Sequence, residues 1–193
     1  MTWNLVAPTG GFSLLRHNVF FSGSSAGEFG DLFERGRLPA DPTVYVCALD
    51  RGDPGGAGPR GAERLLCLVN APATADVQEP DAHALARCEE AAFARLSRCG
   101  LRLHRDDAHT LRTTPHDFAR MFPATGGALY GPASHGWRAS FRRPGARSAV
   151  EGLYLAGGST HPGPGLPMAA LSGRQAAASL LADRDAAARR GRA

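Results

Sequence analysis

The sequence predicts a mixed α/β fold, and three observations lead to that prediction. Several runs rich in β-branched, aromatic and aliphatic residues read as buried strands, and residues 43–49 and 64–69 are the clearest of them. Residues 80–99 instead repeat apolar residues at the spacing of one helical face. Near the carboxyl end, a short strand pattern, a glycine-rich loop and a long helix pattern follow one another over residues 152–183.

The composition is that of an ordinary soluble protein. Of 193 residues, 43% are hydrophobic and 21% are charged, which argues against a disordered chain and against a bundle of membrane spans. The net charge is only +4, and all 22 basic residues are arginines that are scattered rather than interleaved with aromatic residues. No nucleic-acid partner is therefore expected.

The amino end and the cysteines both favour a reduced, cytoplasmic setting. The opening Met1–Leu5 has no basic start and reaches Pro8 too soon for the apolar core of a secretory signal. The four cysteines show no C-x-x-C spacing, so they read as reduced thiols rather than as a disulfide or zinc framework. His104, His109 and His116 do not share metal-ligand spacing with nearby cysteines or carboxylates, so no metal site is expected.

The first third of the chain is predicted to be mainly strands. Residues 2–7 and 12–22 read as two strands, and Pro8–Gly11 between them has the composition of a turn. The strands over 43–49 and 64–69 follow, separated by a Gly/Pro-rich surface loop over residues 52–61.

A helix is predicted between the second and third strands. Over residues 25–35, Phe29, Leu32 and Phe33 recur at the i, i+3, i+4 spacing of one helical face. The aromatic residues of this region are candidates for the core first and for the wall of an apolar tunnel second: Phe20, Phe21, Phe29 and Phe33.

The middle of the chain predicts two more helices. The helix over 80–99 has a single apolar face and a plausible stop at Gly100; that face consists of Leu85, Cys88, Ala92 and Leu96. Thr114 to Asp117 has the pattern of a capping box at the start of a second helix. Residues 101–150 hold eight arginines and only three aspartates. This local positive charge indicates either a solvated basic face or a nearby anionic cofactor or lipid headgroup.

The strand-loop-helix near the carboxyl end is the most informative segment. A strand over residues 152–156 leads through glycines into a helix over 167–183, whose predicted inward side chains are Leu171, Ala178 and Leu181. The first helical turn has no acidic side chain, which leaves its N–H groups and the positive end of the helix dipole for a ligand. The alternatives are a dinucleotide phosphate loop, or a glycine-rich link packed against its own sheet.

Four segments together resemble one protein family. The run GLYLAGGSTHPGPGLPMAALSGRQAAASLL is similar to the C-terminal flavin motif of the bacterial carotenoid (phytoene) desaturases. Three upstream segments resemble the methoxyneurosporene dehydrogenase, or hydroxycarotenoid desaturase, branch of that family, and the resemblance covers almost the whole chain: RHNVFFS at 16–22, LPADPTVYVC at 38–47 and FPATGGALYG at 122–131.

The resemblance implies the C-terminal part of a two-domain FAD-binding fold of the amine-oxidase type. Such a part combines a mainly antiparallel substrate-domain sheet and helices with the closing strand-loop-helix of the FAD domain. The implied division is a substrate-domain portion over residues 1–115, a connecting segment over 116–150 that returns to the FAD domain, the strand-loop-helix over 151–183, and a frayed tail over 184–193.

The resemblance also implies partners outside this sequence. Family members begin with a strand-turn-helix carrying G-x-G-x-x-G, which holds the ADP part of FAD, and no residues here correspond to it. The chain is therefore expected to be a truncated, split or mis-started gene product that needs an N-terminal FAD-domain chain. Its substrate would be a carotenoid-like apolar molecule, so peripheral contact with the inner face of the membrane is expected as well.

In this family, FAD accepts a hydride equivalent from a polyene C–H as a double bond is inserted. The implied FAD contacts are the two glycines after the strand and the helix start: Gly157, Gly158, Leu166, Pro167, Met168 and Ala169. The helix start would stabilise the negative charge that builds on the flavin pyrimidine edge. No catalytic acid or base is implied, and His161 is interpreted as a residue that structures the loop.

Three functions stay open at this point. The first is the C-terminal portion of an FAD-dependent carotenoid desaturase that is incomplete alone. The second is a related FAD-dependent oxidoreductase with another apolar substrate. The third is a non-catalytic remnant or interaction module.

Overall fold

The computed structural model describes residues 1–52, 59–78, 81–130 and 143–191. Most of the loop predicted over 52–61, Gly131 of the last upstream motif and residues 192–193 of the tail lie outside the described residues. The chain folds as two compact units, Met1–Gly127 and Ala128–Ala193. The assignment of parts of the chain to a substrate domain and an FAD domain stays a prediction.

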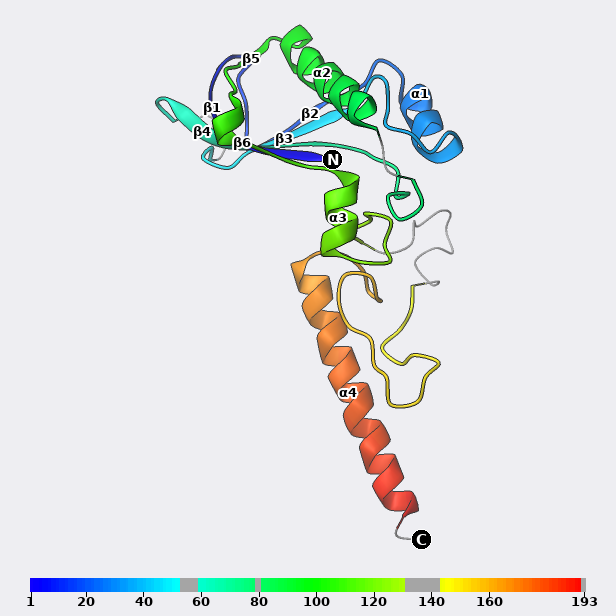
Figure 1. The fold of residues 1–193 in the computed structure, drawn as a ribbon. Coiled ribbons are helices and arrows are strands. Elements are labelled where there is room, and N and C mark those ends of the chain that lie inside the picture. Colours follow the sequence, from blue (N-terminus) through cyan, green and yellow to red (C-terminus); the bar gives the residue numbers. More distant parts are fainter. Residues whose placement is uncertain (53–58, 79–80, 131–142, 192–193) are drawn as a thin grey trace. The chain divides into compact units, whose positions relative to one another are not determined.

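A six-stranded antiparallel sheet forms the centre of the first unit (Figure 1). Its order is β2-β3-β4-β1-β5, and β6 also pairs with β1, along the half of that strand that β5 leaves open. The strands predicted over 2–7, 43–49 and 64–69 are confirmed. The six strands are β1 (Thr2–Gly11), β2 (His17–Phe20), β3 (Val44–Ala48), β4 (Ala62–Val69), β5 (Leu101–Leu103) and β6 (Thr110–Thr113).

The turn predicted at Pro8–Gly11 is wrong, because these residues continue β1. Pro8 lies opposite Ala62 at the end of the β1–β4 pairing, and Thr9 to Gly11 pair with β5. The backbones approach so closely that a Cβ on Gly11 would lie 2.1 Å from the Gly100 carbonyl oxygen. Glycine therefore marks a close strand contact here rather than a chain reversal. The second strand, predicted over residues 12–22, covers only residues 17–20.

One face of the sheet packs against helix α2 (Ala82–Arg98) and forms the core. Trp3, Leu65 and Val46 from the sheet are almost fully buried, as are the helix residues Cys88, Ala92 and Leu96. Asp81 caps the helix by accepting a hydrogen bond from the Ala84 amide, 2.6 Å away. The predicted helix and its apolar face are confirmed, with Leu85 half-buried at the margin.

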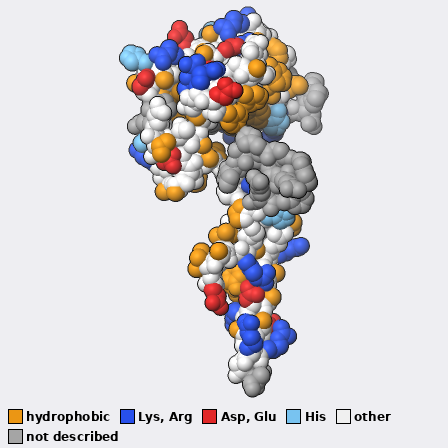
Figure 2. Space-filling view, turned by 90° about the vertical axis from the view of Figure 1, so that its right-hand side faces the viewer, with side chains coloured by type: hydrophobic (Ala, Val, Ile, Leu, Met, Phe, Trp, Pro, Cys, Tyr) orange, Lys and Arg blue, Asp and Glu red, His pale blue; other side chains and the backbone are white. Residues whose placement is uncertain are grey.

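The helix predicted over 25–35 is present, but its inner face differs from the prediction. Leu32 is buried, whereas Phe29 and Phe33 are 50% and 64% exposed and stack on each other with ring centroids 6.0 Å apart. Phe21 is 71% exposed, so Phe20 alone of the four aromatic core candidates lies in the core. Hydrophobic side chains are visible at the surface of both units in Figure 2. The helix consists of α1 (Ser25–Phe29) and a π-helical continuation, η1 (Gly30–Glu34).

Two buried carboxylates decide which side of this helix faces inward. Glu28 accepts a hydrogen bond from the Thr43 hydroxyl at 2.7 Å. Asp31 accepts hydrogen bonds from Arg35 and Arg37 at 2.7 and 2.8 Å, and the Arg35 bond is the main cause that lowers the pKa of Asp31 to about 2. Because buried polar groups must be hydrogen-bonded, these contacts fix the helix orientation and leave the phenylalanines outside.

The capping box predicted at Thr114 is confirmed. The Thr114 hydroxyl accepts from the Asp117 amide at 3.2 Å, and the Asp117 carboxylate accepts from the Thr114 amide at 2.9 Å. These two bonds begin the short helix α3 (Pro115–Met121), which directly follows β6.

The described residues of the second unit form a small hairpin, a turn-rich loop and helix α4 (Leu166–Arg190). The strand predicted over 152–156 is reduced to an isolated bridge between Arg147 and Tyr154. A strand needs a neighbour along its length, and within the described residues only the segment from Ala146 to Ser148 pairs with it.

The inner face of α4 was also predicted wrongly. Leu171 and Leu181 are 37% and 56% exposed, and Ala178 is exposed. The face turned toward the rest of the unit instead carries Ser172 and Asp183: Arg147 donates to Asp183 at 2.9 Å, and so does the Tyr154 hydroxyl at 2.8 Å. Polar anchors therefore decide the orientation of this helix too.

The tail predicted to fray after Asp183 is helical as far as Arg190. Three consecutive alanines, Ala186 to Ala188, are strong helix formers. Arg189 and Arg190 lie in the last turn, where positive charge interacts favourably with the helix dipole.

Candidate functional site

The six predicted cofactor contacts lie around the start of α4. Gly157 and Gly158 form the turn that precedes the loop, and Leu166 to Ala169 form the first helical turn. The two segments are close in space, because an added Cβ on Gly158 would lie 3.6 Å from the Pro164 Cα atom. The structure therefore gathers the predicted residues within one unit.

The helix start offers unpaired amides. Gly165 is the N-cap residue and supplies no side-chain hydrogen bond, and the first turn has no acidic residue. The Leu166 and Met168 N–H groups make no hydrogen bond within the described residues, and Leu166 is 88% exposed. Such groups, together with the positive end of a 25-residue helix, favour an anionic or electron-accepting ligand.

Two glycines keep the backbone accessible beside these amides. Gly157 and Gly165 have φ angles of 122° and 104°, which side-chain-bearing residues rarely adopt. An added Cβ at either position would meet no atom within 4 Å. A ligand can therefore approach the main chain closely at both places.

Ser172 fastens the glycine turn to the helix. Its hydroxyl is buried and accepts a hydrogen bond from the Gly157 amide at 2.8 Å, while it donates to the Ala169 carbonyl at 2.7 Å. Ser172 is not among the predicted site residues. From the sequence, Ser172 could have been found only by its position about one and a half turns into the helix, on the same face as Ala169.

Removing this hydroxyl is expected to loosen the turn. In Ser172→Ala, the Gly157 amide loses its acceptor, at a cost of about 1–3 kcal/mol for an unsatisfied buried group. Faster amide hydrogen exchange at Gly157 in the whole chain measures the effect. Ser179→Ala, one helical repeat further on, is the matched control. Equal exchange in both variants would contradict the role of Ser172.

An arginine lies against the same loop. Arg143 donates hydrogen bonds to the carbonyl oxygens of Gly158 and Tyr130 at 3.2 and 3.1 Å. Its Nε atom lies 3.7 Å from the position that a Cβ on Gly163 would occupy. A positive charge thus lies beside the glycine turn. His161 is exposed, and its amide donates to the Pro144 carbonyl at 2.8 Å.

The sheet face turned away from α2, here called the outer face, is a second candidate surface. Its side chains are largely apolar and only partly covered: Val6, Val19, Tyr45, Leu66, Leu68 and Leu111. Val6 and Leu111 line an open hollow of about 470 Å³ on this face, together with Leu49 and the polar Asn4 and Arg64. The surface suits an extended apolar molecule.

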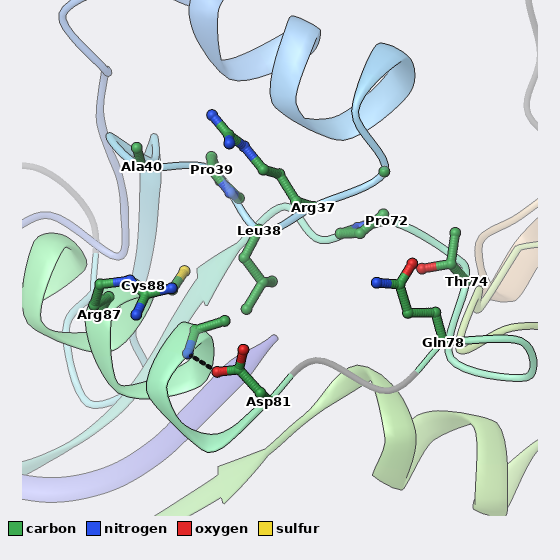
Figure 3. A pocket seen from close by; sticks show the side chains of 12 residues that line it. Arg37, Leu38, Pro39, Ala40, Pro72, Thr74, Gln78, Asp81, Arg87 and Cys88 are labelled. Atoms are coloured by element: carbon green, nitrogen blue, oxygen red, sulfur yellow. Dashed lines mark hydrogen bonds between the residues drawn. The ribbon is translucent and has the colours of Figure 1, made fainter.

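A further cavity of about 480 Å³ lies between the loop after η1 and the start of α2 (Figure 3). Leu38 forms part of its wall. Two of its polar groups are engaged elsewhere, since Asp81 caps α2 and Arg37 pairs with Asp31.

The remaining candidates are the four cysteine thiols and the dispersed acidic side chains. All four cysteines are unpaired, and burial raises the pKa of Cys67 to about 12. Within the described residues, no three His, Cys, Asp or Glu side chains gather as a metal site would require. In the same part of the chain, no helix combines the length and apolarity needed to cross a bilayer.

Comparison with known proteins gives three informative relatives. The hydroxyneurosporene desaturase of Rubrivivax gelatinosus is 52% identical, over 98% of this chain and 36% of its own length. The enzyme of the same name from Cereibacter sphaeroides is 44% identical, over 94% of this chain and 35% of its own. A 1-hydroxycarotenoid 3,4-desaturase from a Flavobacterium species is 30% identical, over 82% and 32%. The chain spans about a third of the length of these curated relatives.

These relatives confirm the resemblance to carotenoid desaturases that four sequence segments indicated. The family described as flavin containing amine oxidoreductase matches residues 20–181. That match includes strands β3 to β6, the glycine turn and most of α4. The chain therefore belongs to the flavin containing amine oxidoreductase family.

Proposed function

We propose that this chain supplies the substrate-facing sheet and one side of the flavin site of an FAD-dependent carotenoid desaturase. The observation that carries the proposal is the unpaired helix start at Leu166–Ala169, in a chain 52% identical to a hydroxyneurosporene desaturase. The same chain presents an apolar outer face. A flavin oxidoreductase acting on a polyene needs both features.

The residues of the second unit fit FAD. The Leu166 and Met168 amides and the open backbone of Gly157 would hold an edge of the flavin ring system and its attached chain. When bound, FAD supplies the hydride-accepting chemistry. The contribution of the chain is electrostatic, because the dipole of α4 and the charge of Arg143 favour negative charge at this place.

The outer face would carry the substrate. Apolar side chains from four neighbouring strands make it suitable for a long polyene, which gains stability when it is removed from water. The reaction removes hydrogen from a polyene C–H and inserts a double bond. The proposal needs no acid or base from this chain.

Two partners belong to this proposal. The exposed apolar side of α4, with Leu166, Leu171 and Leu181, would pack against an FAD-domain polypeptide that holds the ADP part of the cofactor. Because carotenoids reside in bilayers, the assembled protein would contact the inner face of the membrane peripherally, in the cytoplasm.

A hybrid protein tests the proposal. This chain replaces the matching third of the Rubrivivax gelatinosus relative, and the parent relative is the control. The hybrid is expected to purify with bound FAD and to desaturate a hydroxylated neurosporene in a pigment-producing host. A folded hybrid without flavin absorption would favour the non-catalytic alternative. A flavin-loaded hybrid that leaves carotenoids unchanged would favour another apolar substrate.

A further inference from the structure

A His–Tyr pair lies at the β2 side of the outer face, away from the polar Asn4 and Arg64 on β1 and β4. His17 on β2 and Tyr45 on β3 lie diagonally across the strand pair, with the His17 Nδ1 atom 2.7 Å from the Tyr45 hydroxyl oxygen. Their rings stack at 19°, with centroids 6.1 Å apart. The neighbouring outward residues are apolar: Val19, Cys47, Leu66 and Leu68.

The pair leaves one hydrogen-bonding atom available. The Nδ1 atom of His17 is engaged by Tyr45, while the ring makes no second hydrogen bond within the described residues and is exposed. The other ring nitrogen, Nε2, can therefore donate or accept, according to the tautomer. Burial, and next the Cys47 thiol, raises the pKa of Tyr45 above its ordinary 10, so the phenol keeps its proton at neutral pH.

The position of the pair suits one end of a long ligand. The hollow beside Val6 lies on β1, and His17 lies three strands away on the edge strand β2. At the usual strand spacing, that separation is about 14 Å. Asn4 of β1 lines the hollow, and from it a molecule lying straight across the strands would meet Leu66 of β4 and Cys47 of β3 before it reached His17.

We propose that His17, oriented by Tyr45, hydrogen-bonds a hydroxyl group at the end of the carotenoid and so selects hydroxylated over unsubstituted substrates. The inference rests on the proposed function, since it takes the outer face as the substrate surface. Apolar contact alone cannot distinguish a hydroxylated polyene from its parent, whereas one directional hydrogen bond can. His17 is the contact residue, and Tyr45 is a positioning residue.

Binding measurements on the whole 193-residue chain test the pair directly. The probes are detergent-dispersed 1-hydroxyneurosporene and neurosporene, and binding is followed by the shift of polyene absorption. We expect the hydroxylated carotenoid to bind about fivefold more tightly, which is the worth of one exposed neutral hydrogen bond. His17→Leu is expected to remove this preference without weakening neurosporene binding, and His17→Gln to restore part of it.

Tyr45→Phe distinguishes the role of the Tyr45 hydroxyl in orienting His17 from the packing of the Tyr45 ring. It keeps the ring but removes the hydroxyl that holds His17, so the preference should fall about twofold to threefold. His83→Leu, at an exposed position in α2, is the matched control and should leave the preference intact.

Equal binding of both carotenoids by the unsubstituted chain, or a preference that survives in His17→Leu, would overturn the inference while leaving the proposed function standing. Binding of neither carotenoid would count against both.

Discussion

Arg51→Ala is expected to lower the free energy of unfolding by about 3 kcal/mol or more, because it leaves a buried carboxylate without its cation. Arg51 forms two hydrogen bonds to Glu63, at 2.7 and 2.8 Å, and Glu63 is 2% exposed. The Thr9 hydroxyl donates to the same carboxylate. Arg51 also donates to the Leu14 carbonyl at 3.0 Å, so one side chain connects β4, β1 and the segment before β2. Urea denaturation measures the loss.

A neighbouring ion pair provides a matched control. Arg64 pairs with Asp50 at 2.5 Å, but the Arg64 side chain is 65% exposed. Arg64→Ala is therefore expected to cost far less stability than Arg51→Ala, because exposed ion pairs contribute little. Arg51→Lys retains the charge without the forked geometry and should fall between the two. Equal losses for Arg51→Ala and Arg64→Ala would show that burial does not determine the strength of these pairs.

The cluster of Arg51, Glu63 and Thr9 also predicts how stability changes as the pH falls. Burial alone would raise the pKa of Glu63, but the hydrogen bonds from Arg51 and Thr9 outweigh it and hold this pKa below its ordinary 4.5. A carboxyl whose pKa is lowered by folding stabilises the folded state above the unfolded pKa, and this contribution is lost as the pH falls through the folded pKa. The difference between the unsubstituted chain and Glu63→Gln should therefore shrink below pH 4.5.

The sheet and α2 could be predicted from the sequence because their apolar residues alone determine which side is buried. Trp3 and Leu5 alternate with exposed residues along β1, and Cys88, Ala92 and Leu96 repeat along α2. These patterns act locally, and the packing agrees with them. The prediction of a turn at Pro8–Gly11 was wrong because β1 pairs with β5, about 90 residues away in the chain. This pairing overrides the local preference for a turn.

The inner faces of two helices were predicted wrongly, and for the same physical reason. In α1 the buried carboxylate Glu28 fixes the inner face, and in α4 the buried hydroxyl Ser172 and the ion-paired Asp183 do so. Hydrophobic periodicity cannot identify such a face, because the partners of these groups come from distant segments. The outward leucines of α4 are consistent with the proposed FAD-domain partner.

The candidate cofactor site was predictable in outline but not in detail. The absence of an acidic residue in the first turn of α4 can be read directly from Pro167 to Ala170. The hydrogen bond from the Gly157 amide to Ser172 and the approach of Arg143 to Gly158 depend on how the loop folds back. Loop geometry of this kind carries little sequence signal beyond its glycines and prolines.

Met168→Glu is expected to weaken FAD binding by about tenfold in the hybrid protein, while the helix itself becomes no less stable. Met168 is 40% exposed and is the third residue of α4, where a glutamate interacts favourably with the helix dipole. The same negative charge would repel the electron-rich carbonyl oxygens of the flavin pyrimidine edge at the helix start. The substitution should therefore keep or raise the stability of the helix while it lowers the affinity for FAD.

Met168→Gln is the matched control, because it has nearly the same shape as the glutamate without its charge. Its flavin affinity should stay within about threefold of the unsubstituted hybrid, since only electrostatics should separate the two variants. Flavin released on dialysis gives the affinities, and thermal unfolding of the flavin-free proteins gives the helix effect. If Met168→Glu and Met168→Gln hold FAD equally well, the start of α4 does not face the flavin, because a charge placed against the cofactor in a partly dehydrated site could not remain without effect.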